Sequence, residues 1–220
     1  LVRSELLTDL GCNAIVNPPD LAVLEENTGI AVMLGNGDGT FGSRLASTLE
    51  NGVGKMATGD FNGDGLVDLA VVHETLNKVS VLLGYGDGTF GSPIDSAVGS
   101  DGPVDLVTAD VNEDGVLDVV TANRVGASIS VLTGMGDGAF EAPTVVPIPI
   151  ADFFPGSIAT ADFNRTDEIG RTDFPDHADF VIGKAVGAAA SDVLVLFDLF
   201  DLFGEGGGTL ADYFEIDVSS

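Results

Sequence analysis

Two short segments place carboxylates and amides at alternate positions, a pattern suited to a hard metal ion. Positions 1, 3, 5, 7 and 9 are Asp60, Asn62, Asp64, Leu66 and Asp68 in the first segment, and Asp110, Asn112, Asp114, Val116 and Asp118 in the second. Alternate positions of a tightly wound loop can point inward together. The Asp and Asn side chains would then supply oxygens, with a backbone carbonyl from position 7. Calcium takes six to eight oxygens at about 2.3–2.6 Å, so the sequence predicts two Ca²⁺ sites.

The alternative is a turn rich in Asp and Asn that binds no metal. We favour calcium, because three carboxylates within nine residues repel one another unless a cation lies between them. Cys and His are absent from both segments, which argues against zinc or copper. The last acidic residue is an Asp at position 9, whereas an EF-hand loop ends in Glu at position 12. Gly63 and Gly65 permit the sharp turn, and Glu113 replaces the first of these glycines in the second loop.

A third, altered copy of the loop begins at Asp162 and Asn164. About nine extra residues follow before Asp179, which stands where the intact loops have position 9. Asp173 or Asp176 are other acidic residues that would complete the site. A metal site and a metal-free turn both stay open here, and Asp162, Asn164 and Asp179 are its candidate ligands.

The loops belong to an internal repeat with a period of about 50 residues. Asp60 and Asp110 are 50 residues apart. A second motif, which reads GYGDGTF in its middle copy, ends at Phe41, Phe90 and Phe140, which are 49 and 50 residues apart. Altered copies at both ends give four units, at approximately 1–50, 51–100, 101–150 and 151–220. A period of this size is typical of propeller blades and other repeat proteins.

Each unit is predicted to contain four short strands. Segments such as LVDLAVV and SVLLG are rich in β-branched and aliphatic residues, and Gly and Asp clusters bound them. The GYGDGTF segment is expected to turn a hairpin, with Gly86 and Gly88 supplying the permissive backbone. The helix-like stretch at 185–191 is more simply a loop. The prediction is an all-β fold, a β-propeller built of about four four-stranded blades in one domain, 1–220.

These motifs together resemble the FG-GAP repeats of integrin α-subunit heads and the VCBS repeats of bacterial extracellular proteins. The signature stands as Phe90-Gly91-Ser92-Pro93 and, more loosely, as Phe140-Glu141-Ala142-Pro143. The resemblance implies a propeller with calcium loops between the first two strands of a blade, serving in adhesion, in carbohydrate binding or as a module attached to an enzyme. Such propellers have about seven blades. Four units therefore imply a fragment, an unusually small four-bladed ring, a ring completed by another chain, or an array that shares blades.

The composition excludes several partners. The 220 residues carry 35 Asp and Glu against 8 Lys and Arg, a formal charge of −27, which repels nucleic acid and anionic lipid. Bound divalent metal or a salt-adapted surface would relieve this repulsion. The single cysteine, Cys12, allows no intrachain disulfide, and no apolar run is long enough for a transmembrane helix. The chain opens at Leu1 with no visible signal peptide, so we expect a processed or trimmed extracellular protein.

No catalytic residue or organic cofactor site is predicted. His73 and His177 could each be drawn into a Ser–His–Asp arrangement, but lone histidines are usually structural. The glycines of GYGDG and GMGDG lack the helix that a dinucleotide site requires. The apolar stretch LFDLFDLFG at 196–204 is either a buried closing strand or, as we favour, an interface. The predicted function is a calcium-binding adhesion module for a protein or glycan ligand. The alternatives are a structural subunit of a filament or array and, less favoured, a polysaccharide-degrading enzyme.

Overall fold

The computed structural model describes residues 3–7, 18–25, 29–50, 52–148, 154–161, 179–184, 193–198 and 214–217. Its sixteen strands form four antiparallel sheets of four strands, and each sheet follows chain order without a crossover. The first two sheets contain β1 (Arg3–Leu7), β2 (Asp20–Glu25), β3 (Gly29–Met33) and β4 (Leu45–Ser47), then β5 (Val53–Gly59), β6 (Asp68–His73), β7 (Lys78–Leu82) and β8 (Ile94–Ala97).

The third and fourth sheets repeat this plan. Their strands are β9 (Pro103–Ala109), β10 (Asp118–Asn123), β11 (Ser128–Leu132) and β12 (Thr144–Pro147), then β13 (Pro155–Ala161), β14 (Asp179–Lys184), β15 (Val193–Asp198) and β16 (Phe214–Asp217). We call these sheets blades 1 to 4. The described residues contain no helix. The predicted all-β fold of four-stranded blades is therefore confirmed.

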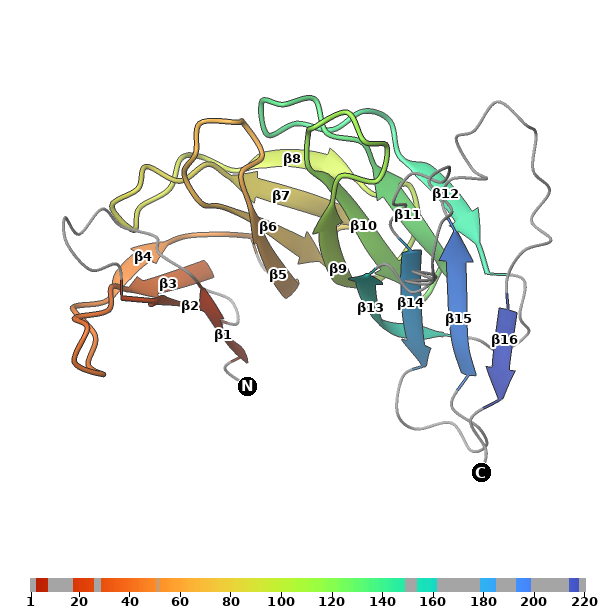
Figure 1. The fold of residues 1–220 in the computed structure, drawn as a ribbon, viewed down its shortest axis with the longest axis horizontal. Helices are drawn as coiled ribbons and strands as arrows, with labels where there is room; N and C mark the ends of the chain where they lie inside the picture. The colour runs from red at the N-terminus through yellow and green to blue at the C-terminus, as the bar shows by residue number, and fades with distance from the viewer. Residues whose placement is uncertain are drawn as a thin grey trace, which may run out of the picture.

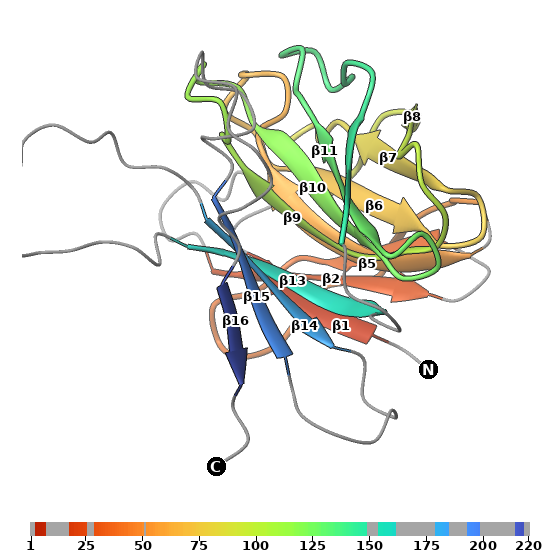
Figure 2. The same ribbon diagram turned by 90° about the vertical axis from the view of Figure 1, so that its right-hand side faces the viewer.

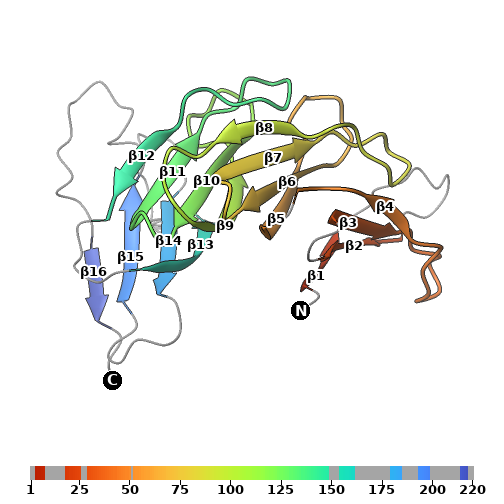
Figure 3. The same ribbon diagram turned by 180° about the vertical axis from the view of Figure 1, so that it is seen from behind.

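The blades stand side by side along an open arch, with blade 1 at one end and blade 4 at the other (Figure 1). The first strands β5, β9 and β13 are neighbours from blade to blade. Seen from behind, the first strand β1 and the last strand β16 lie apart from each other, in the blades at the two ends of the same arch (Figure 3). The turned view shows that the strands are twisted within the sheets (Figure 2), as is usual for β-strands of L-amino acids.

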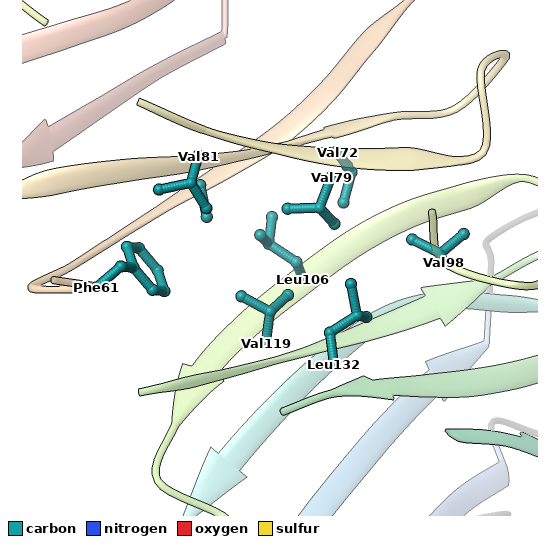
Figure 4. Close-up of a cluster of buried hydrophobic side chains, with 9 residues drawn as sticks. Phe61, Val72, Val79, Val81, Val98, Leu106, Val119 and Leu132 are labelled. Carbon is teal, nitrogen blue, oxygen red and sulfur yellow. The ribbon is translucent and has the colours of Figure 1, made fainter. Parts of the chain in front are cut away.

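The core lies between successive blades, and blades 2 and 3 are covered on both faces. Every residue of β6 and β10 is buried, so these strands are buried along their whole length rather than on alternate residues. One face of blade 2 packs toward blade 1, through Leu69, Val71 and Leu82. The other face packs toward blade 3, where Val72, Val79 and Val81 meet Leu106, Val119 and Leu132 (Figure 4). A third cluster joins blade 3 to Ile158 of blade 4.

The outermost strands behave differently, since β8 and β4 alternate between half-buried and exposed residues. Among the described residues, no helix is long and apolar enough to cross a membrane. Cys12, His177, the helix-like stretch 185–191 and residues 199–204 of the predicted interface lie outside the described residues.

Candidate functional site

The two intact Asp loops have the same place and the same conformation in successive blades. The loop from Asp60 joins β5 to β6, the loop from Asp110 joins β9 to β10, and both rise from the same side of the arch (Figure 1). Left-handed backbone is required twice in each loop, at Gly63 (φ 72°) and Gly65 (φ 81°) in the first. The prediction that glycine makes the sharp turn is confirmed there.

The first loop is organised by hydrogen bonds from its own backbone to its carboxylates. Asp60 accepts the amide protons of Asp64 (3.1 Å) and Gly65 (2.8 Å), one on each oxygen. The side-chain oxygen of Asn62 accepts the same Asp64 amide at 3.0 Å, and Asp64 accepts from Leu66 at 2.8 Å. The Asn62 amide nitrogen donates to the second Asp64 oxygen at 2.8 Å. These bonds hold positions 1, 3 and 5 in one short, wound segment.

The second loop repeats this network with the same donors and acceptors. Asp110 accepts from the Asp114 and Gly115 amides, Asn112 accepts from Asp114, and Asp114 accepts from Val116, at distances between 2.8 and 3.1 Å. Glu113 occupies the left-handed conformation that Gly63 has in the first loop, with φ of 58°. The repeat therefore conserves the geometry of the loop even where the residue type is unfavourable.

Position 9 has a structural role that the sequence analysis did not predict. Asp68 is fully buried, and its two carboxylate oxygens accept the amides of Phe61 (2.9 Å) and Gly84 (2.7 Å). It thus fastens the start of the Asp loop and the start of the β7–β8 hairpin to β6. Asp118 likewise accepts the amides of Val111 and Gly134, and Asp20 accepts the amide of Gly35. The signal was present in the sequence as an Asp followed by a Gly 15 or 16 residues later.

Burial raises the pKa of Asp68. Hydrogen bonds from the amides of Gly84 and Phe61 lower this pKa in part, and the negative charges of Asp64 and Asp60 raise it further. Burial likewise raises the pKa of Asp118. Hydrogen bonds from the amides of Gly134 and Val111 lower this pKa, and the charges of Asp114 and Asp110 raise it. Each loop therefore concentrates negative charge beside a buried carboxyl group. Asp64 and Asp114 are exposed, so a cation from solvent can reach this charge.

The donor set of each loop fits a hard cation, since it offers only carboxylate, amide and carbonyl oxygens. As the side chains stand, no group of three or more His, Cys, Asp or Glu within the described ranges is gathered as ligands of one ion. For the third loop, Asp162 and Asn164 lie outside the described residues, and Asp179 begins β14. Calcium at these three loops stays a prediction.

The predicted hairpins are confirmed, and the glycine-rich segments serve as turns rather than nucleotide loops. Gly84 bridges Phe90, Gly35 bridges Phe41 and Gly134 bridges Phe140, and each hairpin leads from the third strand of a blade to the fourth. Gly86 and Gly88 have φ of 72° and 84°, as expected. Antiparallel order places the hairpins at the same end of each blade as the Asp loops. Tyr85 and Met135 project there, 63% and 59% exposed.

A serine, a histidine and an aspartate do meet in blade 2, but in the wrong order for a catalytic triad. His73 Nε2 lies 2.9 Å from Ser80 Oγ, and Ser80 donates to Asp95 at 2.6 Å. The serine lies between the other two, whereas a triad requires the histidine in that place. His73 and Ser80 are both fully buried, so no substrate reaches this serine.

Comparison with known proteins agrees with the repeat. A family model described as FG-GAP-like repeat matches residues 19–71, 60–121 and 110–167, more than half of the chain. No curated protein sequence matches the chain. Among solved structures, the fold is similar to that of an Agrocybe aegerita lectin, described as specifically recognising non-reducing terminal N-acetylglucosamine.

The lectin and this chain are 19% identical with a TM-score of 0.52. The similarity covers 90% of this chain but only 52% of the lectin, so the chain spans about half of the lectin's length. At this identity the likeness concerns the fold alone. The three matches to the family model, together with the blades, hairpins and Asp loops, show that the chain belongs to the FG-GAP-like repeat family.

Proposed function

We propose that this protein is a non-catalytic ligand-binding module that works outside the cell and is stabilised by Ca²⁺ in its Asp loops. The observation that carries the proposal is the repetition of one wound loop, with oxygen donors at positions 1, 3, 5, 7 and 9, in two successive blades. Asp60, Asn62, Asp64 and Asp68 would hold the first ion with the Leu66 carbonyl. Asp110, Asn112, Asp114, Asp118 and the Val116 carbonyl would hold the second.

Calcium would supply positive charge where the loops gather carboxylates. Because Asp68 and Asp118 are buried beside exposed acidic groups, a divalent ion offsets both the burial and the mutual repulsion of these charges. The remaining loop, with Asp162, Asn164 and Asp179, is proposed as a weaker third site. The location is proposed as extracellular because calcium modules with affinities of about 10⁻⁴–10⁻³ M work there.

The ligand surface is proposed on the end of the blades that carries the Asp loops and the hairpins. Tyr85 and Met135 occupy the same register position in successive blades and are largely exposed. An aromatic ring with a polar tip is suited to a surface that contacts both apolar and hydroxylated groups. The fold of a lectin supports a glycan as the ligand class. The net charge of −27 disfavours nucleic acid and anionic membranes.

Isothermal titration of the intact chain with calcium tests the metal sites. We expect at least two ions per chain, and two fewer for Asp64→Ala/Asp114→Ala. The matched control is Asp87→Ala/Asp137→Ala, which removes two exposed hairpin carboxylates and should keep the wild-type stoichiometry. Equal heats in the wild type and in the loop variant would overturn the calcium proposal.

A glycan array that includes terminal N-acetylglucosamine, probed in calcium, tests the ligand class. Binding should fall at least tenfold for Tyr85→Ala, because the exposed ring is lost. The control is Leu76→Ala, an exposed apolar residue (46%) in the β6–β7 turn at the other end of the blade. Absence of binding to every glycan would count against a lectin-like role, and loss with the Leu76 variant alone would move the site to the opposite end.

A further inference from the structure

The asparagine at position 3 of each Asp loop has its side-chain amide held at both ends. Asn62 Oδ1 accepts the backbone amide of Asp64 at 3.0 Å, and Asn62 Nδ2 donates to Asp64 Oδ2 at 2.8 Å. Asn112 makes the same two bonds with Asp114, at 3.1 and 2.9 Å. A hydrogen bond to a carbonyl oxygen stabilises the negative charge that develops there when a nucleophile attacks the adjoining carbon. The side-chain carbon Cγ of both asparagines is therefore activated toward attack.

The nearest nucleophile is the backbone nitrogen of the residue that follows each asparagine. Its attack on Cγ closes a succinimide ring within the chain, a reaction that proximity favours. The following residue is Gly63 in the first loop and Glu113 in the second, and both have left-handed backbone, with φ of 72° and 58°. Glycine lacks the Cβ that would obstruct the approach of the nitrogen to Cγ. The two loops thus offer the same activated side chain with an unobstructed nucleophile in only one.

The backbone nitrogen of Gly63 is also free to react. Other glycines that follow an acidic residue have their amides engaged, since Gly65 donates to Asp60 at 2.8 Å and Gly138 donates to the Phe61 carbonyl at 3.1 Å. Within the described residues, the Gly63 amide donates to no acceptor. Gly63 is exposed, and a Cβ there would have no described atom within 4 Å, so solvent reaches this amide.

The hairpin of blade 1 provides a second asparagine–glycine pair for comparison, Asn36–Gly37. Gly37 is exposed and left-handed, with φ of 79°. Asn36 Nδ2 donates to Thr40 Oγ1 at 2.9 Å, but no group of the described residues donates to Asn36 Oδ1. This pair therefore has the same sequence as Asn62–Gly63 without the hydrogen bond that activates the side-chain carbon.

We propose that Asn62 is a site of spontaneous deamidation. The Gly63 nitrogen loses its proton to solvent base and bonds to Asn62 Cγ, and the side-chain nitrogen takes up a proton and leaves as ammonia. Water then opens the succinimide at one of its two carbonyls, which gives either aspartate or isoaspartate at position 62. The net reaction converts asparagine and water into a carboxylic acid and ammonia, with no oxidation or reduction.

The modification changes the first Asp loop and leaves the second as it is. A carboxylate at position 62 replaces the Nδ2 donor that lies 2.8 Å from Asp64, so two negative charges face each other where a hydrogen bond was. Isoaspartate in addition lengthens the main chain between positions 62 and 63. If the loops hold calcium as proposed above, the change alters a ligand of the first ion only. That consequence rests on the proposed function, whereas the reaction itself requires no metal.

Peptide mapping by mass spectrometry tests the proposal on the intact chain, kept in alkaline buffer with a chelator. Deamidation raises the mass of a peptide by one unit, so the asparagines can be followed separately. We expect Asn62 to react at least tenfold faster than Asn112, and also faster than Asn36. A rate at Asn62 no greater than the rate at either of the other two asparagines would overturn the proposal.

Two exchanged variants provide the matched controls. Glu113→Gly should raise the rate at Asn112 toward that of Asn62, and Gly63→Glu should lower the rate at Asn62 toward that of Asn112. Unchanged rates in both variants would show that the following residue does not control the reaction and would overturn the proposal.

The role of the fold is tested by repeating the experiment in urea. Unfolding removes the hydrogen bond to Asn62 Oδ1, so the rates at Asn62 and Asn36 should become similar. A ratio of these rates that stayed the same in urea would contradict the activation by the Asp64 amide. Because the reaction is measured as mass in chelator and calcium binding as heat, failure of one proposal is distinguishable from failure of the other.

Discussion

At the scale of single residues, the aspartate at position 9 has two separable roles. Its carboxylate is a proposed calcium ligand, and it also bonds two backbone amides that are distant in sequence. Asp20 keeps the hairpin bond to Gly35 in a unit whose Asp loop is altered, so the structural role persists without an intact loop. A carboxylate at this position is therefore required by the blade itself, whether or not a metal binds.

Asp68→Ala should lower the free energy of unfolding by about 2–4 kcal/mol even in chelator, because it leaves the Phe61 and Gly84 amides without an acceptor. Urea unfolding with a chelator measures this. Asp64→Ala is the matched control, since Asp64 is exposed and should cost well under 1 kcal/mol under those conditions. Equal losses for the two variants would refute the structural role of Asp68.

Glu113 is a residue in which the repeat tolerates strain. It adopts φ of 58° where the first loop has Gly63. Glu113→Gly should raise the free energy of unfolding by about 1 kcal/mol, and Gly63→Glu should lower it by a similar amount, because left-handed backbone costs a residue with a Cβ about 1–2 kcal/mol. A Cβ on Gly63 would have no atom of the described residues within 4 Å, so a steric clash would not contribute to the effect of Gly63→Glu. Stabilisation by Gly63→Glu would contradict this explanation.

At the scale of elements, blades 1 to 3 each carry polar side-chain contacts on or beside their second to fourth strands, with different residues each time. Arg44 bonds Glu25 in blade 1, and Asn123 bonds Ser128 and Ser130 in blade 3. In blade 2, Lys78 bonds Asp95 at 2.7 Å and also Glu50, a residue at the edge of the preceding unit. All three blades therefore contain such a contact, and the kind of residue that makes it varies from blade to blade.

The pair Lys78–Asp95 should stabilise blade 2 over a defined pH range. Burial lowers the pKa of Lys78, but hydrogen bonds to Asp95 and Glu50 outweigh it and leave the pKa above 10.5. Burial raises the pKa of Asp95, but bonds from Lys78 and Ser80 leave it below 3.8. The Lys78 contribution is present below 10.5 and lost as pH rises through the raised value. The Asp95 contribution is present above 3.8 and lost as pH falls through the lowered value.

A double-mutant cycle with Lys78→Met and Asp95→Asn measures this coupling, which we expect to be about 1 kcal/mol near neutral pH. The modest size reflects the 47% exposure of the Asp95 side chain. The coupling should be constant between the two pKa values. A coupling that changed between pH 6 and pH 8 would show that another group, with His73 the nearest candidate through Ser80, controls the pair.

Most of the strands, hairpins and loops of each blade could be predicted from the sequence, because their formation depends on the residues of the segment itself. The hairpin glycines, the alternation of Asp loop and strand, and the four strands of each unit all follow from turn residues and β-branched runs. The bond from Asp68 to Gly84 and the contact of His73 with Ser80 could not, since both depend on register between strands. The exposure of Phe41 relative to Phe90 depends on which blade lies next to each, which no local pattern encodes.

At the scale of the whole molecule, the fold is a series of blades that bury their faces against one another along an open arch (Figure 1). Blades 2 and 3 are covered on both faces, and this explains their fully buried central strands. Stability in such repeats is approximately a sum of unit and junction terms. A cation bound in the loops of blades 2 and 3 would therefore stabilise the two central blades, against which blades 1 and 4 pack.

Thermal unfolding with calcium and with a chelator, on the wild type and on Asp64→Ala/Asp114→Ala, tests the central claim most directly. Two sites at about 100-fold excess over the dissociation constant stabilise by roughly 5 kcal/mol together, which corresponds to a rise in Tm on the order of 10 °C or more. We predict this rise for the wild type and its loss in the double variant. Equal melting temperatures with calcium and with chelator would contradict the account and leave the loops as turns held by their own backbone.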